Sequence, residues 1–228
     1  MQYIDNIPTD WYEKRVPRPT RQKPERGNAR TRLLEAARDV IRAKGFAASS
    51  VDDLCQAAAV TKGAFFHHFP SKEALGVAAA RYWTETTGAF FAAAPYHEPC
   101  DPLDRILAYV AFRKAIITEE LAEFTCLVGT MVQEVYDDSP AIREACAESL
   151  FGHAATLEED IAAAMSARGM SGAFTAQSLA RHTQAVLQGA FVLAKAGNDP
   201  ALARESLDHL DRYLRLLFTC PSKGELDV

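Results

Sequence analysis

Residues 61–75, with the sequence TKGAFFHHFPSKEAL, bring together two hydroxyl groups, two lysines and two adjacent histidines. The hydroxyl of Thr61 and the ammonium group of Lys62 can bind phosphate oxygens, and the imidazoles of His67 and His68 can bind phosphates or the edges of bases. Thr61 is also a favourable cap for a short helix that would run to about His67. These residue types therefore favour contact with a nucleic acid.

Small and aromatic residues are interleaved with these polar groups. Gly63 and Ala64 would keep the helix slender, so that its backbone can approach a duplex closely. Phe65 and Phe69 lie four residues apart on one helix face, and they are predicted to enter a hydrophobic core. Phe66 then points away from that core.

Other chemistries have less support. Adjacent residues do not face each other on a helix, and no HxxxH pattern or nearby cysteine completes a site with His67 and His68, so we expect no metal. A surface role without a ligand remains open for each histidine. The sequence contains no G-x-S-x-G, P-loop, H-E-x-x-H or dinucleotide-binding motif, and its paired glutamates at 119–120 and 158–159 are typical of solvated helix faces. We expect neither enzymatic activity nor a cofactor.

Charge is distributed unevenly along the 228 residues. Residues 14–75 contain 13 Lys and Arg against 6 Asp and Glu, a balance of +7, whereas the whole chain has a formal net charge of -5. Much of this positive charge lies in residues 1–27, where four prolines and little apolar periodicity indicate an extended arm. A basic end on an acidic chain is typical of proteins that bind a polyanion, although a basic tail without a partner has the same composition.

The elements that would position these groups are helical. From residue 28, apolar residues recur at helical spacing as far as Gly45, and Ser49 or Ser50 can cap a second helix with two aspartates in its first turn. A third helix follows from Thr61. Three short helices with a tight turn between the second and the third form a helix-turn-helix domain, which we predict at residues 28–75.

The remaining residues, 76–228, are predicted to form a larger helical domain without strands. Helices are expected at about 71–92, 102–119, 121–136, 140–167, 175–196 and 200–218. The fold class is therefore predicted to be all-α.

The order of these features resembles the TetR family of transcriptional regulators. The sequence SSVDDLCQAAAVTKGAFFHHFPSKEAL, preceded by a basic arm, is similar to the DNA-binding signature of that family, and the resemblance covers residues 29–76 closely. It implies a regulator, usually a repressor, that binds double-stranded operator DNA as a homodimer and is released by a small molecule. The DNA-binding residues expected from the resemblance and the residue types are Arg30, Ser49, Ser50, Thr61, Lys62, Gly63, Ala64, Phe66, His67, His68 and Lys72.

Two of these positions have a particular meaning in the family. The position of Lys72 usually contacts phosphate. The position of Phe66 is usually a tyrosine whose hydroxyl contacts phosphate, which phenylalanine cannot do.

The resemblance also implies a small-molecule pocket in the acidic helical domain. Such pockets are mainly apolar with a few polar groups, so we expect a hydrophobic or amphipathic effector. The candidate ligand-binding residues are aromatic residues and polar residues set among apolar neighbours: Trp83, Tyr109, Phe112, Arg113, Cys126, Met131, Gln133, Phe151 and His182. A purely structural role remains the alternative for each of them.

The five cysteines are scattered without a CxxC spacing, which argues against a disulfide framework and a zinc site and fits reduced thiols. A redox sensor that works through Cys126 or Cys146 on the same DNA-binding scaffold is an alternative function. The sequence has no secretory signal and no run of 18 apolar residues. We therefore expect a cytoplasmic protein without a membrane partner.

The last two helices are predicted to pair two chains. Apolar stripes run along both of them, formed by Leu179, Val186, Ala190 and Leu193 on one and by Ala203, Leu207, Leu210, Leu214 and Leu217 on the other. Two such helices from each chain can form a four-helix bundle about a twofold axis, as in the family. Burial of both stripes within one chain is the alternative.

Overall fold

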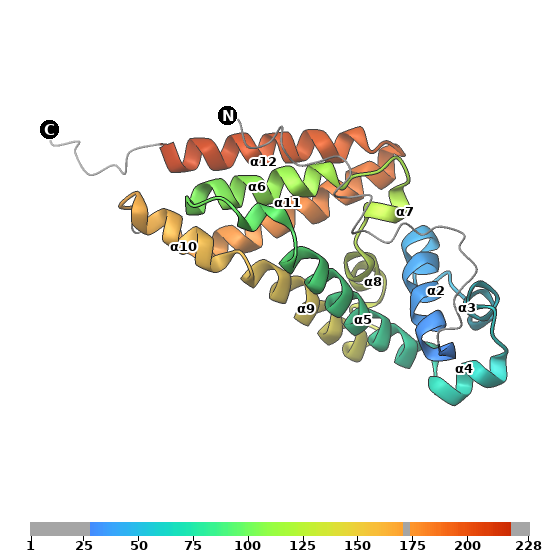
Figure 1. The fold of residues 1–228 in the computed structure, drawn as a ribbon. Coiled ribbons are helices and arrows are strands. Elements are labelled where there is room, and N and C mark those ends of the chain that lie inside the picture. The colour runs from blue at the N-terminus through green and yellow to red at the C-terminus, as the bar shows by residue number, and fades with distance from the viewer. Residues whose placement is uncertain (1–27, 171–173, 220–228) are drawn as a thin grey trace, which may run out of the picture. The chain divides into compact units, whose positions relative to one another are not determined.

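The computed structural model describes residues 28–170 and 174–219, and every regular element in these ranges is a helix (Figure 1). The predicted all-α fold class is confirmed, whereas the basic arm at residues 1–27 lies outside the described residues. The chain forms two compact units. We call residues 28–93 and 122–150 the N-terminal unit, and the other described residues the C-terminal unit.

The N-terminal unit is built around the predicted helix-turn-helix. Its helices are α2 (Ala29–Lys44), α3 (Val51–Ala58), α4 (Lys62–His68), α5 (Lys72–Ala92), α8 (Leu127–Val135) and most of α9 (Pro140–Ala155). The short α7 (Leu121–Phe124) lies where the chain passes from one unit to the other.

Each helix from α2 to α5 begins at a side chain that accepts a hydrogen bond from a backbone amide in the first turn. Such caps satisfy amide groups that have no partner within the helix. The pairs are Asn28 with Arg30 at 2.9 Å, Ser50 with Asp53 at 3.1 Å, Thr61 with Ala64 at 3.2 Å, and Ser71 with Ala74 at 3.0 Å. Ser50, rather than Ser49, is therefore the cap of α3.

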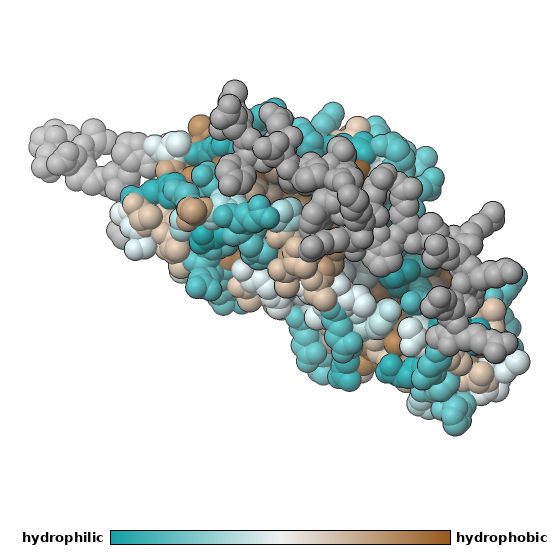
Figure 2. All heavy atoms as spheres, viewed as in Figure 1, coloured by the Kyte–Doolittle hydropathy of each residue, from teal (hydrophilic) through white to brown (hydrophobic). Residues whose placement is uncertain are grey.

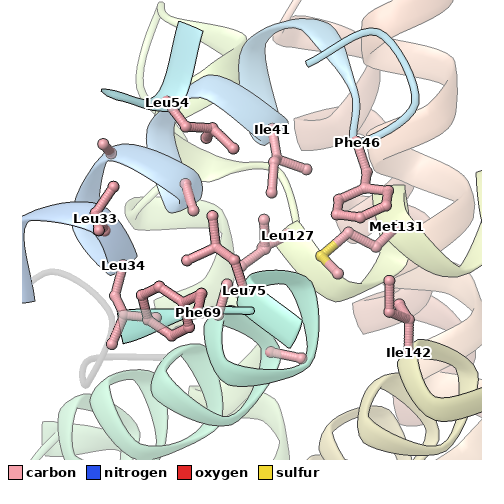
Figure 3. Close-up of a cluster of buried hydrophobic side chains, with 14 of the residues drawn as sticks. Leu33, Leu34, Ile41, Phe46, Leu54, Phe69, Leu75, Leu127, Met131 and Ile142 are labelled. Atoms are coloured by element: carbon pink, nitrogen blue, oxygen red, sulfur yellow. The ribbon is translucent and has the colours of Figure 1, made fainter. Parts of the chain in front are cut away.

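The core of the N-terminal unit joins the helix-turn-helix to α5, α8 and α9 (Figure 3). The buried side chains labelled there are Leu33, Leu34, Ile41, Phe46, Leu54, Phe69, Leu75, Leu127, Met131 and Ile142. Phe65 and Phe69 are both buried, as the four-residue spacing predicts. The boundary expected between residues 75 and 76 does not separate the compact units, because α5 continues from the helix-turn-helix and α8 packs against α2.

Three of the predicted helices are shorter than expected. A hydrogen bond, long-range in two cases and local in the third, lies at or near the point where each one is interrupted or ends. The helix predicted at 121–136 is broken at Thr125, whose carbonyl accepts a hydrogen bond from the Arg42 guanidinium at 2.9 Å. The helix predicted at 102–119 ends at Ala115, and the carbonyl of Ile117 accepts from Arg204 at 3.0 Å. The helix predicted at 140–167 is divided at Thr156, whose hydroxyl donates to the His153 carbonyl.

The C-terminal unit is a set of packed helices. After a short 3₁₀ turn, η2 (Pro95–His97), it contains α6 (Pro102–Ala115), the end of α9, α10 (Glu158–Ala167), α11 (Ala176–Gly197) and α12 (Ala201–Thr219). Its helices turn apolar side chains towards one another, among them Ile106, Ile161, Leu187 and Leu207. Hydrophilic residues cover much of the described surface on the face drawn in Figure 2.

The apolar stripe on α12 predicted to pair two chains is mostly buried within one chain. Ala203, Leu207, Leu210 and Leu214 are buried within the single chain, where α12 packs on α6 and α11. Leu179 and Ala190 of α11 are buried in the same way. Burial within one chain, the alternative to chain pairing, is therefore correct for these six residues. A helix that packs between two neighbours buries its most apolar face against them.

The loop between α2 and α3 depends on Gly45. This residue has φ +92° and ψ 160°, a conformation that is essentially restricted to glycine, and a Cβ there would collide with the Glu134 carboxylate. Gly45→Ala is expected to lower the free energy of unfolding by about 1–3 kcal/mol, as measured by urea denaturation.

Gly88→Ala is the matched control. Gly88 lies inside α5, and a Cβ there would meet no atom within 4 Å, so this change should raise stability by about 0.5–1 kcal/mol. A neutral Gly45→Ala would contradict the proposed constraint on the loop.

Candidate nucleic-acid interface

The exposed side of α4 carries most of the predicted DNA-binding residues. Thr61, Lys62, Gly63, Phe66 and His67 are exposed, whereas Ala64 and His68 are partly buried at its flanks. A helix turns by about 100° per residue, so the burial of Phe65 places Gly63 and His67 on the opposite, outward side. Figure 1 shows α4 at an outer edge of the N-terminal unit, next to α2 and α3.

Two aromatic residues hold α4 in place. The ring of Phe65 is fully buried, and the ring of Phe69, which ends the helix, lies 6.1 Å from it between centroids. The guanidinium of Arg30 stands 5.5 Å from the Phe69 ring centroid, within the range of a cation–π contact. Arg30 therefore lies at the first turn of α2, beside the end of α4, and its charge is displayed at the same surface.

The turn before α4 contains a non-glycine residue in the left-handed conformation. Ala59 has φ 51° and ψ 48°, and its carbonyl accepts a hydrogen bond from the Arg32 guanidinium at 3.2 Å. Arg32 thus ties α2 to the turn between α3 and α4. The arrangement of α3, the turn and α4 is the predicted helix-turn-helix.

Lys62 has a partner in the free protein. Its ammonium group lies 2.8 Å from the carboxylate of Asp52 on α3, and this hydrogen bond raises the pKa of Lys62. Both side chains are well exposed, so the ion pair contributes little to stability. The Lys62 ammonium group can therefore exchange the Asp52 carboxylate for a phosphate at a low cost in free energy.

Ser49 and Ser50 have different roles. Ser49 is only 2% exposed, and its hydroxyl donates to the Gly45 carbonyl at 2.5 Å, so its side chain is not displayed at the surface of the free protein. Ser50 is exposed, but its hydroxyl donates to the Asp53 carboxylate at 2.6 Å while it accepts from the Asp53 amide. Lys44 and Ser50 together hold the pKa of Asp53 well below its usual range.

Lys72 is also placed differently from the expectation. Its ammonium group donates to the carbonyls of Phe46 and Ser49, both at 2.8 Å, and stands 4.4 Å from the Phe46 ring centroid. Burial lowers the pKa of Lys72. In the free protein Lys72 therefore clamps the loop between α2 and α3 onto the start of α5, and these contacts compete with the expected phosphate contact.

The same loop is held from a second helix. The Glu134 carboxylate of α8 accepts a hydrogen bond from the Ala47 amide at 2.7 Å. Sequence reasoning missed Glu134, because nothing in the pattern around it indicates a partner 87 residues earlier. The base of the helix-turn-helix is thus fixed by Lys72 on one side and by Glu134 on the other.

The predicted ligand-binding residues fall into both units. In the N-terminal unit, Trp83 is half-buried beneath the Arg42 guanidinium, whose carbon lies 5.1 Å from its ring centroid, and Met131 belongs to the core. The thiol of Cys126 caps α8 by accepting from the Gly129 amide at 3.4 Å. The Gln133 side chain donates to the Gly129 carbonyl at 2.7 Å, within its own helix.

In the C-terminal unit, three predicted residues lie together. Tyr109, Phe112 and Arg113 are all buried on α6. The Tyr109 hydroxyl lies 2.8 Å from Nε2 of His153, and burial together with the Arg113 charge lowers the pKa of His153 to about 3. Tyr96 packs its ring against both Tyr109 and Phe112, and burial raises its pKa above the usual range.

Tyr96 and His153 were not predicted, because they lie 13 and 44 residues from Tyr109 and neither belongs to a polar motif. The structure does not place the other two candidates in this cluster. Phe151 is exposed, with the Arg181 guanidinium 5.5 Å from its ring centroid. His182 is exposed, and its ring contacts the ring of Tyr213 of α12.

Metal and thiol chemistry receive no support from the described residues. No group of three His, Cys, Asp or Glu side chains among them could hold a metal ion. Cys146 is fully buried, and burial raises its pKa to about 12, which disfavours the reactive thiolate. Within the described residues, no helix is both long and apolar enough to span a membrane.

Family comparisons agree with the geometry of both parts of the chain. The family described as "Bacterial regulatory proteins, tetR family" matches residues 33–79, and "Tetracyclin repressor-like, C-terminal domain" matches residues 102–210. The first match includes α3, α4 and the turn between them.

Curated relatives match only part of the chain. UidR of Escherichia coli K12, an HTH-type transcriptional regulator, is 46% identical over 46 residues, which are 20% of this chain and 24% of UidR. The HTH-type transcriptional repressors DhaR of Mycobacterium sp. GP1 and NemR of Escherichia coli K12 are each 30% identical, over 114 and 142 residues. These matches span 50% and 58% of this chain and 56% and 66% of the relatives.

Solved structures show the same fold over most of the chain. A TetR regulatory protein from Rhodobacter sphaeroides has a TM-score of 0.72 at 22% identity, covering 82% of this chain and 99% of that one. A TetR-family regulator from Agrobacterium tumefaciens has a TM-score of 0.70 at 21% identity, covering 81% and 96%.

Lys62 and Lys72 are expected to respond differently to substitution. Lys62→Ala should weaken binding about equally on all duplex sequences and reduce the slope of log affinity against log salt by about 1, because one phosphate contact is lost. Asp52→Asn should strengthen binding, because it frees the Lys62 ammonium. Fluorescence anisotropy on a labelled duplex at several salt concentrations measures both.

Lys72→Met is the comparison. It should leave the salt slope unchanged and lower the free energy of unfolding by about 1–3 kcal/mol, because two carbonyls lose a charged donor. A reduced slope with unchanged stability would restore the phosphate contact to Lys72.

Proposed function

This chain belongs to the TetR family of helix-turn-helix transcriptional regulators, and on that premise we propose that it is a repressor that binds a pseudo-palindromic operator as a dimer and is released by a small hydrophobic or amphipathic molecule. The observation that carries the proposal is the exposed side of α4, formed by Lys62, Gly63, Phe66 and His67 on a helix whose other side is locked into the core. A helix presented in this way enters the major groove with its first residues nearest the bases.

The electrostatics of the interface supports binding to DNA. Arg30 and Lys62 contribute exposed positive charge at the two ends of the α4 surface, and they can fix the register on the phosphate backbone. His67 lies on the outward side of the helix, where it can reach base edges. The acidic residues of this surface, Asp52 and Asp53, are both paired with lysines.

An exposed apolar surface on α11 and α12 supports a dimer. Val192 and Leu193 of α11 are 43% and 55% exposed, and Tyr213 and Leu216 of α12 are 43% and 65% exposed. The His182 and Tyr213 rings touch, with centroids 5.3 Å apart, so the exposed sides of the two helices adjoin. A second copy of this surface would complete a four-helix bundle and place two recognition helices about 34–36 Å apart.

The cluster of Tyr96, Tyr109, Arg113 and His153 supports an effector site in the C-terminal unit. It combines aromatic surface with hydroxyl, imidazole and guanidinium groups, which suits an amphipathic molecule with a hydrogen-bonding end. Tyr96 follows closely after the end of α5, whose first residue, Lys72, clamps the helix-turn-helix loop. An effector that displaces Tyr96 can thus act on α5.

Selection of bound sequences from random duplexes tests the proposal. We expect enrichment of two inverted half-sites separated by a fixed spacing, because a twofold dimer imposes its symmetry on the operator. Compounds that release the selected duplex should bind more weakly when operator is present, by the same factor that they weaken operator binding, typically about 5–150-fold. Failure to enrich any sequence would contradict operator binding, and equal compound affinity with and without operator would contradict release.

Leu193→Glu should convert the dimer to a monomer, because a carboxylate would be buried without a partner at the interface. Sedimentation equilibrium measures the mass, and operator affinity should fall in parallel. Tyr136→Glu is the matched control: Tyr136 is exposed to a similar degree, 59%, but directly follows α8 in the N-terminal unit. A Leu193→Glu protein that remains dimeric would exclude this surface.

A further inference from the structure

Phe66 is an exposed aromatic residue in the middle of the proposed recognition helix. Its side chain is 53% exposed, although the residues just before and three positions after it, Phe65 and Phe69, are buried. The Phe65 and Phe66 rings meet edge to face at 5.1 Å, so the buried ring supports the exposed one. Within the N-terminal unit, Phe66 thus contributes apolar surface to the α4 interface rather than to the core.

The space around Phe66 is open. Gly63 lies three residues earlier, on the neighbouring turn of the same helix face, and a Cβ built there would come only within 3.8 Å of the Thr61 hydroxyl. The backbone of α4 can therefore approach a groove on the side next to the Phe66 ring. Lys62, four residues before Phe66, is directed to Asp52 in the free protein.

The chemistry of a phenyl ring restricts what it can recognise on DNA. It has no hydrogen-bonding group, so it cannot satisfy a phosphate oxygen or the donors and acceptors of a base edge. The apolar group that a duplex displays in the major groove is the 5-methyl group of thymine, and phenylalanine is among the residues that contact it. Burying a phenyl ring against phosphates instead would desolvate charged oxygens without compensation.

We propose that Phe66 is a specificity-determining residue that recognises a thymine in each operator half-site through its 5-methyl group. The inference rests on the proposed function, since it requires α4 to lie in the major groove. Lys62 sets the position of the helix on the phosphate backbone, and Phe66 then distinguishes thymine from cytosine, which lacks the methyl group.

The experiment uses the full chain and the operator selected as above. Each thymine of a half-site is replaced in turn by deoxyuridine, which removes the 5-methyl group and keeps the Watson–Crick pairing. At one thymine per half-site the affinity of the natural protein should fall about fourfold, the equivalent of about 0.8 kcal/mol for one buried methyl group. Phe66→Ala should bind both duplexes equally at that position, so that a double-mutant cycle isolates the contact.

Two controls separate this contact from other effects. Phe66→Tyr keeps the ring and should retain the sensitivity to deoxyuridine, whereas Tyr136→Ala, a change at the exposed aromatic residue that follows α8, should leave the whole profile unchanged. Thermal unfolding confirms that Phe66→Ala is folded, as expected for an exposed side chain.

The outcomes are distinguishable. If the natural protein enriches an operator but no thymine methyl group affects its affinity, or if Phe66→Ala keeps the same deoxyuridine profile, the inference about Phe66 is overturned and operator binding stands. If the natural protein enriches no sequence, the proposed function fails, and the inference fails with it.

Discussion

The burial of Phe65 and Phe69 is the interaction on which the DNA-facing surface depends. A helix of seven residues has too few internal hydrogen bonds to be stable in water, so α4 exists because one side of it is packed into the core of the N-terminal unit. The same packing determines which residues are exposed. With Phe65 facing inward, Gly63 and His67 face outward and Phe66 lies beside them.

The loop between α2 and α3 connects this surface to the rest of the N-terminal unit. Its backbone carbonyls bind the ammonium of Lys72, and its Ala47 amide binds the carboxylate of Glu134. These contacts come from α5 and α8. Lys72 is partly exposed and Glu134 is exposed, so water can replace either contact. A change in the position of either helix would therefore act on the loop, and through α3 on the helix-turn-helix.

Both α11 and α12 have apolar residues on two sides, one buried within the chain and the other exposed. The more continuous stripe, with Leu207 and Leu214, packs inside the chain, whereas Leu193 and Leu216 remain on the surface. Apolar side chains that are exposed next to one another are typical of surfaces that bind a partner. Tyr109 and His153 differ from this apolar surface in their chemistry, because the Tyr109 hydroxyl and Nε2 of His153 form a polar pair 2.8 Å apart.

Local sequence alone determined the helical class, the order of the helix-turn-helix, the cap at Thr61 and the buried pair of phenylalanines, and it restricted the cap of α3 to Ser49 or Ser50. Caps and helical periodicity depend on residues within four positions of one another, so they can be read along the chain. The tertiary structure alone decided the roles of Ser49 and Lys72, the side of α12 that is exposed, and the pairing of Tyr109 with His153. These depend on partners up to 44 residues away or on which neighbour covers a helix, and no local pattern encodes that choice.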